Sequence, residues 1–360
     1  MRIHLKGSRP WLPLAIVSLL LCTAAAAEPE YWGDADFHKE YPESVARCAQ
    51  YRTVEPPAAD RPTAAQLSVL KACDSSDAYY GITGPGDPVK ARQCAFAEMA
   101  RGENDGPSGA GVLMMLYANG RGVTENLPYA IRMACTVGGA PFEVSGRIAA
   151  LEGRMKGQGT DTEFDYCDDV TSGYGTSQCA VLGSRVQDQQ RAGKVAALSR
   201  GWTPAQKAAW DRVIAAETAY ADALTDGEVD LSGTMRGVFA QEAENDIKDG
   251  TIGLLEALDG KAMDRAGPGQ FQKSDAALNA AWKKVMANSF EDFGTVTRDG
   301  VRGTQRAWIK YRDAWSAFAG LAWPGMGETV ADYLTRERTN ALLCLVGDDA
   351  CVAADDEDGP

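Results

Sequence analysis

The chain has 360 residues, of which 50 are Asp or Glu and 36 are Lys or Arg, so its formal net charge at pH 7 is −14. This excess of acid argues against nucleic acid and anionic lipid surfaces as partners, because both repel a negative surface, and it favours a basic protein partner. Strand-like alternation is scarce, whereas Ala-rich stretches with helical spacing cover most of the chain. We therefore expect an all-α protein, with a short helical-repeat domain followed by a helical-bundle domain, both stapled by disulfides.

Residues 1–27 have the pattern of a secretory signal peptide. Three basic residues precede an apolar run at 11–22 that is too short to span a bilayer, and residues 24–27 are all alanine, as a cleavage site requires. A retained anchor or a lipoprotein is the alternative, although Leu21 stands where a lipoprotein signal needs a small residue. After cleavage, 50 acidic residues would face 33 basic ones, a charge of −17. We expect a periplasmic or secreted protein with no membrane segment after cleavage.

Eight cysteines follow residue 27, and an even number in an exported chain indicates disulfides. The short spacing of Cys344 and Cys351 favours a terminal loop closed by a disulfide, and Cys167 and Cys179 bracket a Gly- and Asp-rich segment that favours a second. The other four can pair in three ways that the sequence does not distinguish: Cys48, Cys73, Cys94 and Cys135.

Residues 28–155 are expected to form the first domain, with an internal repeat. The residues Tyr80, Gly84, Asp87 and Ala91 recur as Tyr117, Gly120, Asn126 and Ala130, and the two alanines are 39 residues apart. The second copy resembles a Sel-like repeat, a relative of the tetratricopeptide repeat, in which glycines permit a tight turn between paired helices. The resemblance implies a protein-binding platform, for which Tyr117 and Tyr129 are the candidate contact residues. A purely structural helical domain closed by its disulfides is the alternative.

A change of composition at 153–162 indicates a domain boundary, so residues 160–350 are expected to form the second domain and 352–360 an acidic tail. Thr203 and Pro204 predict a helix start, with the threonine as its cap and the proline in its first turn. Further on, Ser274 is the expected cap of another helix.

Regularly spaced aromatic residues predict a buried face on a helix that follows Gln305. The positions i, i+3, i+7, i+10 and i+14 are Trp308, Tyr311, Trp315, Phe318 and Ala322. In the next predicted helix, from about Glu328 to Leu345, Arg338 lies in the apolar stripe. A guanidinium that faces inward must find a carboxylate, and Asp313 and Asp275 are the expected partners. A site for an anionic ligand is the alternative.

Three blocks of residues follow one another in this region. They are D-x-x-L-N-x-x-W (Asp275, Leu278, Asn279, Trp282), Q-R-A-W-x-x-Y-R-D (Gln305, Trp308, Tyr311, Arg312, Asp313) and T-x-x-R-T-x-x-L (Thr335, Arg338, Leu342). In this order they resemble the LprI-type lysozyme inhibitor family. The resemblance implies a helical, exported protein whose partner is a lysozyme or a related cell-wall hydrolase, with motif residues that are mainly structural. The cysteine that typically follows Y-R-D is absent, with Trp315 and Ser316 in its place, so the family disulfide is missing here.

The residues offer little for catalysis. His38 is the single histidine after residue 27 and has no Ser or Cys motif beside it, C-x-x-C pairs are missing, and the Gly-rich turns lack a preceding strand. We therefore expect no metal and no cofactor. The leading hypothesis is a non-catalytic protein-binding module that inhibits a lysozyme or a related hydrolase. The alternatives are an envelope adaptor that uses the repeats, and a glycan hydrolase that uses Asp275 with Asp313 or Glu337 as its carboxylate pair.

Overall fold

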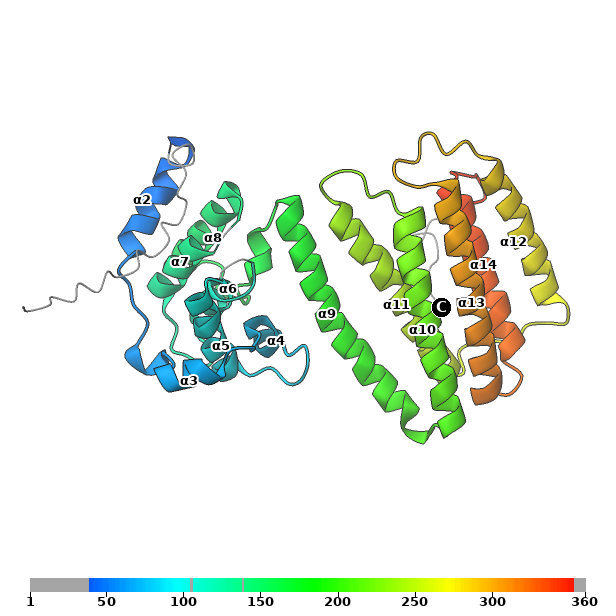
Figure 1. Cartoon of the computed structure of the whole chain (residues 1–360), viewed down its shortest axis with the longest axis horizontal. Coiled ribbons are helices and arrows are strands. Elements are labelled where there is room, and N and C mark those ends of the chain that lie inside the picture. Colours follow the sequence, from blue (N-terminus) through cyan, green and yellow to red (C-terminus); the bar gives the residue numbers. More distant parts are fainter. Residues whose placement is uncertain (1–38, 104–105, 138, 353–360) are drawn as a thin grey trace, which may run out of the picture.

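The computed structural model describes residues 39–103, 106–137 and 139–352. The predicted signal peptide, His38 and residues 353–360 of the predicted acidic tail lie outside these ranges. Throughout the described ranges the regular structure is helical, which confirms the all-α prediction (Figure 1). In the same ranges, each helix is too short or too polar to cross a lipid bilayer.

The first group of helices forms one hydrophobic core and is shown at the left of Figure 1. The helices are α2 (Pro42–Tyr51), α3 (Ala64–Val69), α4 (Ser75–Tyr80), α5 (Pro88–Arg101), α6 (Ala110–Asn119), α7 (Leu127–Thr136) and α8 (Pro141–Arg154), with a 3-10 turn at Ala58–Asp60. The core also includes Phe164 and Tyr166, which follow the composition change at 153–162.

Two helix pairs in this group, α4 with α5 and α6 with α7, share one turn geometry. Gly81 (φ 71°) and Gly120 (φ 63°) end the first helices in the left-handed region, where glycine is favoured. The side chains of Asp87 and Asn126 cap the second helices. Each of these pairs is 39 residues apart. The expected equivalence of Gly84 with Gly120 is therefore wrong, because Gly81 makes the turn.

The alignment of the two helix pairs also shows that Tyr80 and Tyr117 are not equivalent. The backbone N–H of Asp87 donates to the carbonyl of Ala78 (2.8 Å), as that of Asn126 donates to the carbonyl of Tyr117 (2.9 Å), so Ala78 and not Tyr80 is the equivalent of Tyr117. Tyr117 and Tyr129 are 0% and 2% exposed, with their rings 4.8 Å apart. The expectation that they contact a partner protein is wrong, because both are part of the core.

Four disulfides tie the helices together. The structure joins Cys167 to Cys179 and Cys344 to Cys351, the two pairs that the sequence spacing favours. Of the three pairings open for the other cysteines, it has Cys48–Cys135, which links α2 to α7, and Cys73–Cys94, which links the segment before α4 to α5.

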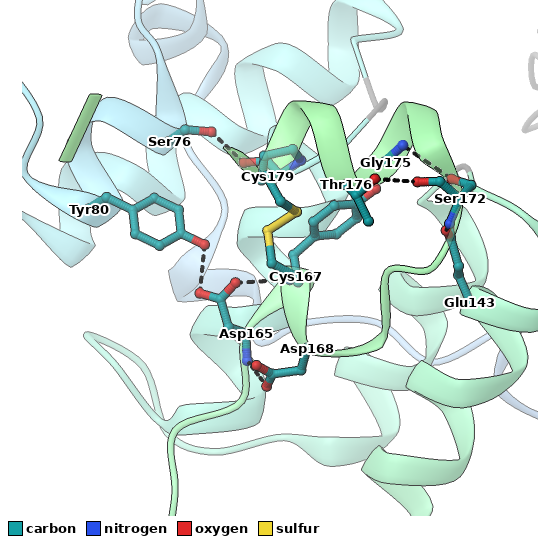
Figure 2. Close-up of a disulfide and its surroundings, with 12 residues drawn as sticks. Ser76, Tyr80, Glu143, Asp165, Cys167, Asp168, Ser172, Gly175, Thr176 and Cys179 are labelled. Atoms are coloured by element: carbon teal, nitrogen blue, oxygen red, sulfur yellow. Dashed lines mark hydrogen bonds between the residues drawn. A yellow bond between two sulfur atoms is a disulfide. The ribbon is translucent and has the colours of Figure 1, made fainter. Parts of the chain in front are cut away.

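The long helix α9 (Gly173–Leu198) begins against the first core (Figure 2). The Cys167–Cys179 disulfide joins its second turn to the 3-10 turn at Tyr166–Asp169. Beside it, the hydroxyl of Tyr80 donates to Asp165 (2.7 Å). The buried carboxylate of Glu143 accepts the backbone N–H groups of Thr171 (2.8 Å) and Ser172 (2.6 Å). These contacts fix the start of α9, whose later turns pack on α11.

The second group of helices forms a separate core around α13 and is shown at the right of Figure 1. Its helices are α10 (Pro204–Glu228), α11 (Arg236–Asp259), α12 (Gln270–Ala287), α13 (Arg298–Ala322) and α14 (Gly327–Leu345), and a 3-10 turn at Ser199–Gly201 connects α9 to α10. The helix α13 packs along α10 and against α14, which in turn packs on α12. Trp308, Tyr311, Trp315 and Phe318 are all at most 4% exposed, which confirms the buried aromatic face.

Local sequence patterns predicted one helix start correctly and another wrongly. Thr203 caps α10 through a capping box with Gln206, as predicted. By contrast α12 begins at Gln270, after Gly269 in the left-handed region, so Ser274 is inside the helix and its hydroxyl donates to the carbonyl of Phe271 (2.9 Å). The expected cap at Ser274 is wrong because the helix starts a turn earlier.

A close contact between α10 and α13 depends on two glycines. A Cβ on Gly300 would lie 2.8 Å from both the Cα and the carbonyl oxygen of Gly227, whereas a Cβ on Gly303, one turn later, would meet no atom within 4 Å. Backbone atoms cannot move aside as a flexible side chain does.

We expect Gly300→Ala to lower the free energy of unfolding by about 1–3 kcal/mol, because the methyl group forces the two backbones apart. The matched variant Gly303→Ala should leave it unchanged or raise it by up to about 1 kcal/mol, because alanine favours the helix. Urea unfolding measures both. Equal effects of the two variants would contradict the close approach.

Candidate functional site

The residues of the three motif blocks divide into an inward and an outward set. Those that face the second core are Leu278, Trp308, Tyr311, Thr335, Arg338 and Leu342, each at most 5% exposed, with Trp282 and Gln305 partly buried. Those that lie at the surface are Asp275, Asn279, Arg312 and Asp313. The blocks therefore build both the bundle and one part of its surface.

Arg338 holds three helices together from the inside. It is 2% exposed, and its two terminal nitrogens donate to the two carboxylate oxygens of Glu228 at 2.7 and 2.6 Å. Its Nε donates to the side-chain oxygen of Gln305 at 2.9 Å. The interaction joins α14 to the last residue of α10 and to α13. A bidentate pair of this geometry is among the strongest hydrogen-bonded ion pairs in proteins.

The expected partners of Arg338 are therefore wrong. Asp313 and Asp275 lie at the surface and pair with Arg312 instead, whereas Glu228 comes from a helix that precedes all three blocks. The expectation failed because a carboxylate 110 residues away in sequence leaves no local signal. Glu228 already occupies the face of the guanidinium that an anionic ligand would need, so this arginine is structural.

Arg312 organises the outward set. Its guanidinium lies 5.2 Å from the ring centre of Trp308 and 5.5 Å from that of Phe271. It donates to Asp313 at 2.9 and 3.1 Å and to Asp275 at 3.5 Å, and so bridges α12 and α13. Contact with aromatic faces suits a planar, weakly hydrated cation.

The two carboxylates beside Arg312 remain open to solvent. The side chains of Asp275 and Asp313 are 43% and 61% exposed, whereas that of Arg312 is 14% exposed. Asn279 donates to the carbonyl (2.8 Å) and to the carboxylate (3.2 Å) of Asp275, which limits its rotation. We call Asp275, Asn279, Arg312 and Asp313 the motif surface. It presents two oriented carboxylates and one covered cation, an arrangement suited to hydrogen-bonding the Lys or Arg side chains of a partner.

The motif surface is separate from three cavities in the described part of the chain. Cavities of about 590, 340 and 180 Å³ are lined by other residues than Asp275 and its two proposed partners for glycan hydrolysis, Asp313 and Glu337. Within the described ranges, His, Cys, Asp and Glu side chains do not gather in groups of three that could hold a metal ion.

One buried acid was missed by the sequence analysis. Glu217 of α10 is 7% exposed, and burial raises its pKa to about 7, while the hydroxyl of Thr251 and the charges of Lys248 and Arg191 oppose the rise. Thr251 in turn bonds the hydroxyl of Tyr311 (2.8 Å). The signal was present, since Glu217 lies between Val213 and Tyr220 on the buried face of α10.

Removal of only one partner of the ion pair between Arg338 and Glu228 should destabilise the fold. Arg338→Met leaves the carboxylate of Glu228 buried without its cation, so unfolding should become easier by about 3–5 kcal/mol in urea titrations. The double variant with Glu228→Gln should recover part of that loss. Arg306→Met, on the exposed side of α13, should cost less than about 0.5 kcal/mol. A double variant as unstable as the sum of its singles would show that the two residues are not coupled.

The raised pKa of Glu217 predicts that the stability of the protein depends on pH. Because its folded-state pKa is raised from an ordinary value near 4.5 to about 7, its contribution to stability is complete below about pH 4.5 and is lost as the pH rises through 7. The free energy of unfolding of the wild type, measured relative to Glu217→Gln, should fall by about 2–3 kcal/mol between pH 5 and pH 8. The exposed control Glu242→Gln should follow the wild type at both pH values. A difference between wild type and Glu217→Gln that does not change with pH would contradict the raised pKa.

Comparison with known proteins finds a family match in the segment that contains the motif surface. A family model described as lysozyme inhibitor LprI matches residues 259–342, which contain all three motif blocks. The match includes α12, α13 and most of α14, but not α10, which supplies Glu228. Comparison with curated proteins and with solved structures found no match. The segment of the chain that is similar to lysozyme inhibitors of the LprI family is therefore the segment that carries the motif surface.

Proposed function

We propose that the protein is an exported, non-catalytic binding module whose motif surface engages a basic lysozyme or a related cell-wall hydrolase. The observation that carries this proposal is the pair of exposed carboxylates, Asp275 and Asp313, which Arg312 holds in place within the segment similar to LprI.

Electrostatics support a cationic enzyme as the partner. The chain carries a formal net charge of −14, so a basic protein is attracted at long range and a negatively charged one is repelled. At short range, the carboxylates of the motif surface are already oriented, so little side-chain entropy is lost when a partner's Lys or Arg binds them. Complementary charge of this kind raises the association rate and fixes orientation.

Export is supported by the covalent structure. Four disulfides persist in an oxidising compartment, which for a bacterial envelope protein is outside the cytoplasm. Residues 1–27 supply the proposed signal peptide, and the peptidoglycan on which lysozymes act lies in the compartment to which it would direct the chain.

The two helix pairs of the first domain, with equivalent turns 39 residues apart, support the proposal that this region is built from Sel-like repeats. The alternative, an adaptor that binds a partner through the first domain, has no support from its proposed contact residues, because Tyr117 and Tyr129 are buried. We therefore assign the partner-binding role to the second domain, and to the first domain a structural one.

The test measures the rate at which a cationic lysozyme clears a suspension of cell walls. The purified protein should slow clearing at low salt, and inhibition should weaken at 150 mM salt, where the Debye length is about 8 Å. The double variant Asp275→Asn with Asp313→Asn should need about tenfold more protein for the same inhibition, because it removes both exposed carboxylates.

The matched control is Asp211→Asn with Asp222→Asn, which makes the same change of charge on the exposed side of α10. It should retain inhibition within about threefold, because only long-range attraction is reduced. Equal losses in both double variants would contradict the motif surface as the site of contact. Unimpeded clearing with the wild type in stoichiometric excess at low salt would contradict a lysozyme as the target.

A further inference from the structure

A second feature of the bundle is a cavity of about 340 Å³ at one end of α13. It lies between the segment that follows α11 and the turn that joins α13 to α14. Its apolar wall consists of Leu258, Met263, Trp323 and Met326. Leu258 is 3% exposed, and the ring of Trp323 packs edge-on against Phe318 at 5.6 Å, so the wall is continuous with the second core.

Two cations, Lys261 and Arg265, line the same cavity. Arg265 donates to the carbonyl of Pro324 at 2.9 Å, which holds its guanidinium over the turn. In the part of the chain that the structure describes, neither cation forms an ion pair. Among the described residues, Asp259 and Asp264 are close in sequence but form no ion pair with either cation, so both positive charges at the edge of the cavity are available to an anionic ligand.

The turn is built to leave room for the guanidinium. Gly325 adopts φ 89°, which residues with a side chain rarely do, and a Cβ at this position would lie 2.5 Å from Nη1 of Arg265. Lys261 is one of two non-glycine residues in the described ranges with a positive φ (57°). The backbone on both sides of the cavity is therefore shaped to place the two cations at its edge.

We propose that this cavity binds a single-chain amphiphilic carboxylate of the fatty-acid class. The alkyl chain would lie against Met263, Trp323 and Met326, whose flexible or flat apolar surfaces adapt to a chain. The carboxylate would bind between Lys261 and Arg265, where its single negative charge would offset half of their combined positive charge. A volume of 340 Å³ is at the lower limit for ligand pockets, which favours a chain of medium length over a diacyl lipid.

Isothermal titration of the purified full-length protein with decanoate, kept below micelle-forming concentration, tests this site. Decanoate should bind saturably with one site per chain. The equally long cation decyltrimethylammonium should bind at least tenfold more weakly, because Lys261 and Arg265 repel it. Saturable decanoate binding that is matched by the cationic analogue would overturn the proposal, as would the absence of saturable decanoate binding.

Matched variants separate the cavity from the rest of the surface. Lys261→Gln with Arg265→Gln should weaken decanoate binding at least tenfold. The control Arg306→Gln with Lys310→Gln removes the same charge from the exposed side of α13, away from the cavity, and should bind decanoate as the wild type does. Equal binding by both double variants would overturn the assignment. Circular dichroism and urea unfolding verify that each variant is folded.

The acidic residues Asp355–Asp358 are the occupant that the experiment must exclude. Deletion of residues 353–360 should leave decanoate affinity unchanged if the cavity is free to bind an external carboxylate. A clear gain of affinity on deletion would show that these residues occupy the cavity and would overturn the proposal.

Discussion

The buried ion pair between Arg338 and Glu228 fixes the arrangement of the second domain. A guanidinium does not lose its proton in a protein, so once α14 turns Arg338 inward a carboxylate must reach it. That carboxylate is the last residue of α10, next to Gly227, whose close approach to Gly300 brings α10 and α13 into contact. The ion pair and this close backbone contact therefore occur at the same end of the bundle.

Once this register is set, the side on which each motif residue lies follows from helical geometry. On α13, Trp308 and Tyr311 share the buried face. Arg312 and Asp313 lie about 100° and 200° further around the helix than Tyr311, so they turn away from that face. Arg312 remains close enough to Trp308 to cover its ring, and from there it reaches Asp275 on α12. A single block of sequence thus supplies the packing of the bundle and an oriented pair of surface carboxylates.

The sequence predicted those features that depend on near neighbours. The cap at Thr203 and the buried aromatic stripe of α13 are encoded within a few turns of helix. It did not predict the partner of Arg338, because helix packing alone brings Glu228 to it. It also misplaced the turn between α4 and α5, since Gly81 and Gly84 are both glycines and only the fold selects which one takes a positive φ.

The failure at Tyr117 has a different physical cause. An aromatic residue on a helix suits either a core or a binding surface, and the helical spacing is the same in both cases. In the structure Tyr117 is fully buried, and its hydroxyl finds a carboxylate, Asp60, at 2.9 Å. The 3-10 turn that carries Asp60 precedes both helix pairs, so the side chain that completes the burial lies outside the residues from which the turn pattern was predicted.

The two exposed sites of the second domain differ in sign and in position. The motif surface presents carboxylates, whereas the cavity at the end of α13 presents Lys261 and Arg265. Along α13, Arg312 and Trp323 are separated by about 16 Å, since a helix rises 1.5 Å per residue. This distance is about two Debye lengths at physiological salt, so the charges at one site barely affect ions at the other. The two proposed partners, a basic protein and an anionic amphiphile, would therefore bind at separate sites, each of opposite charge to its ligand.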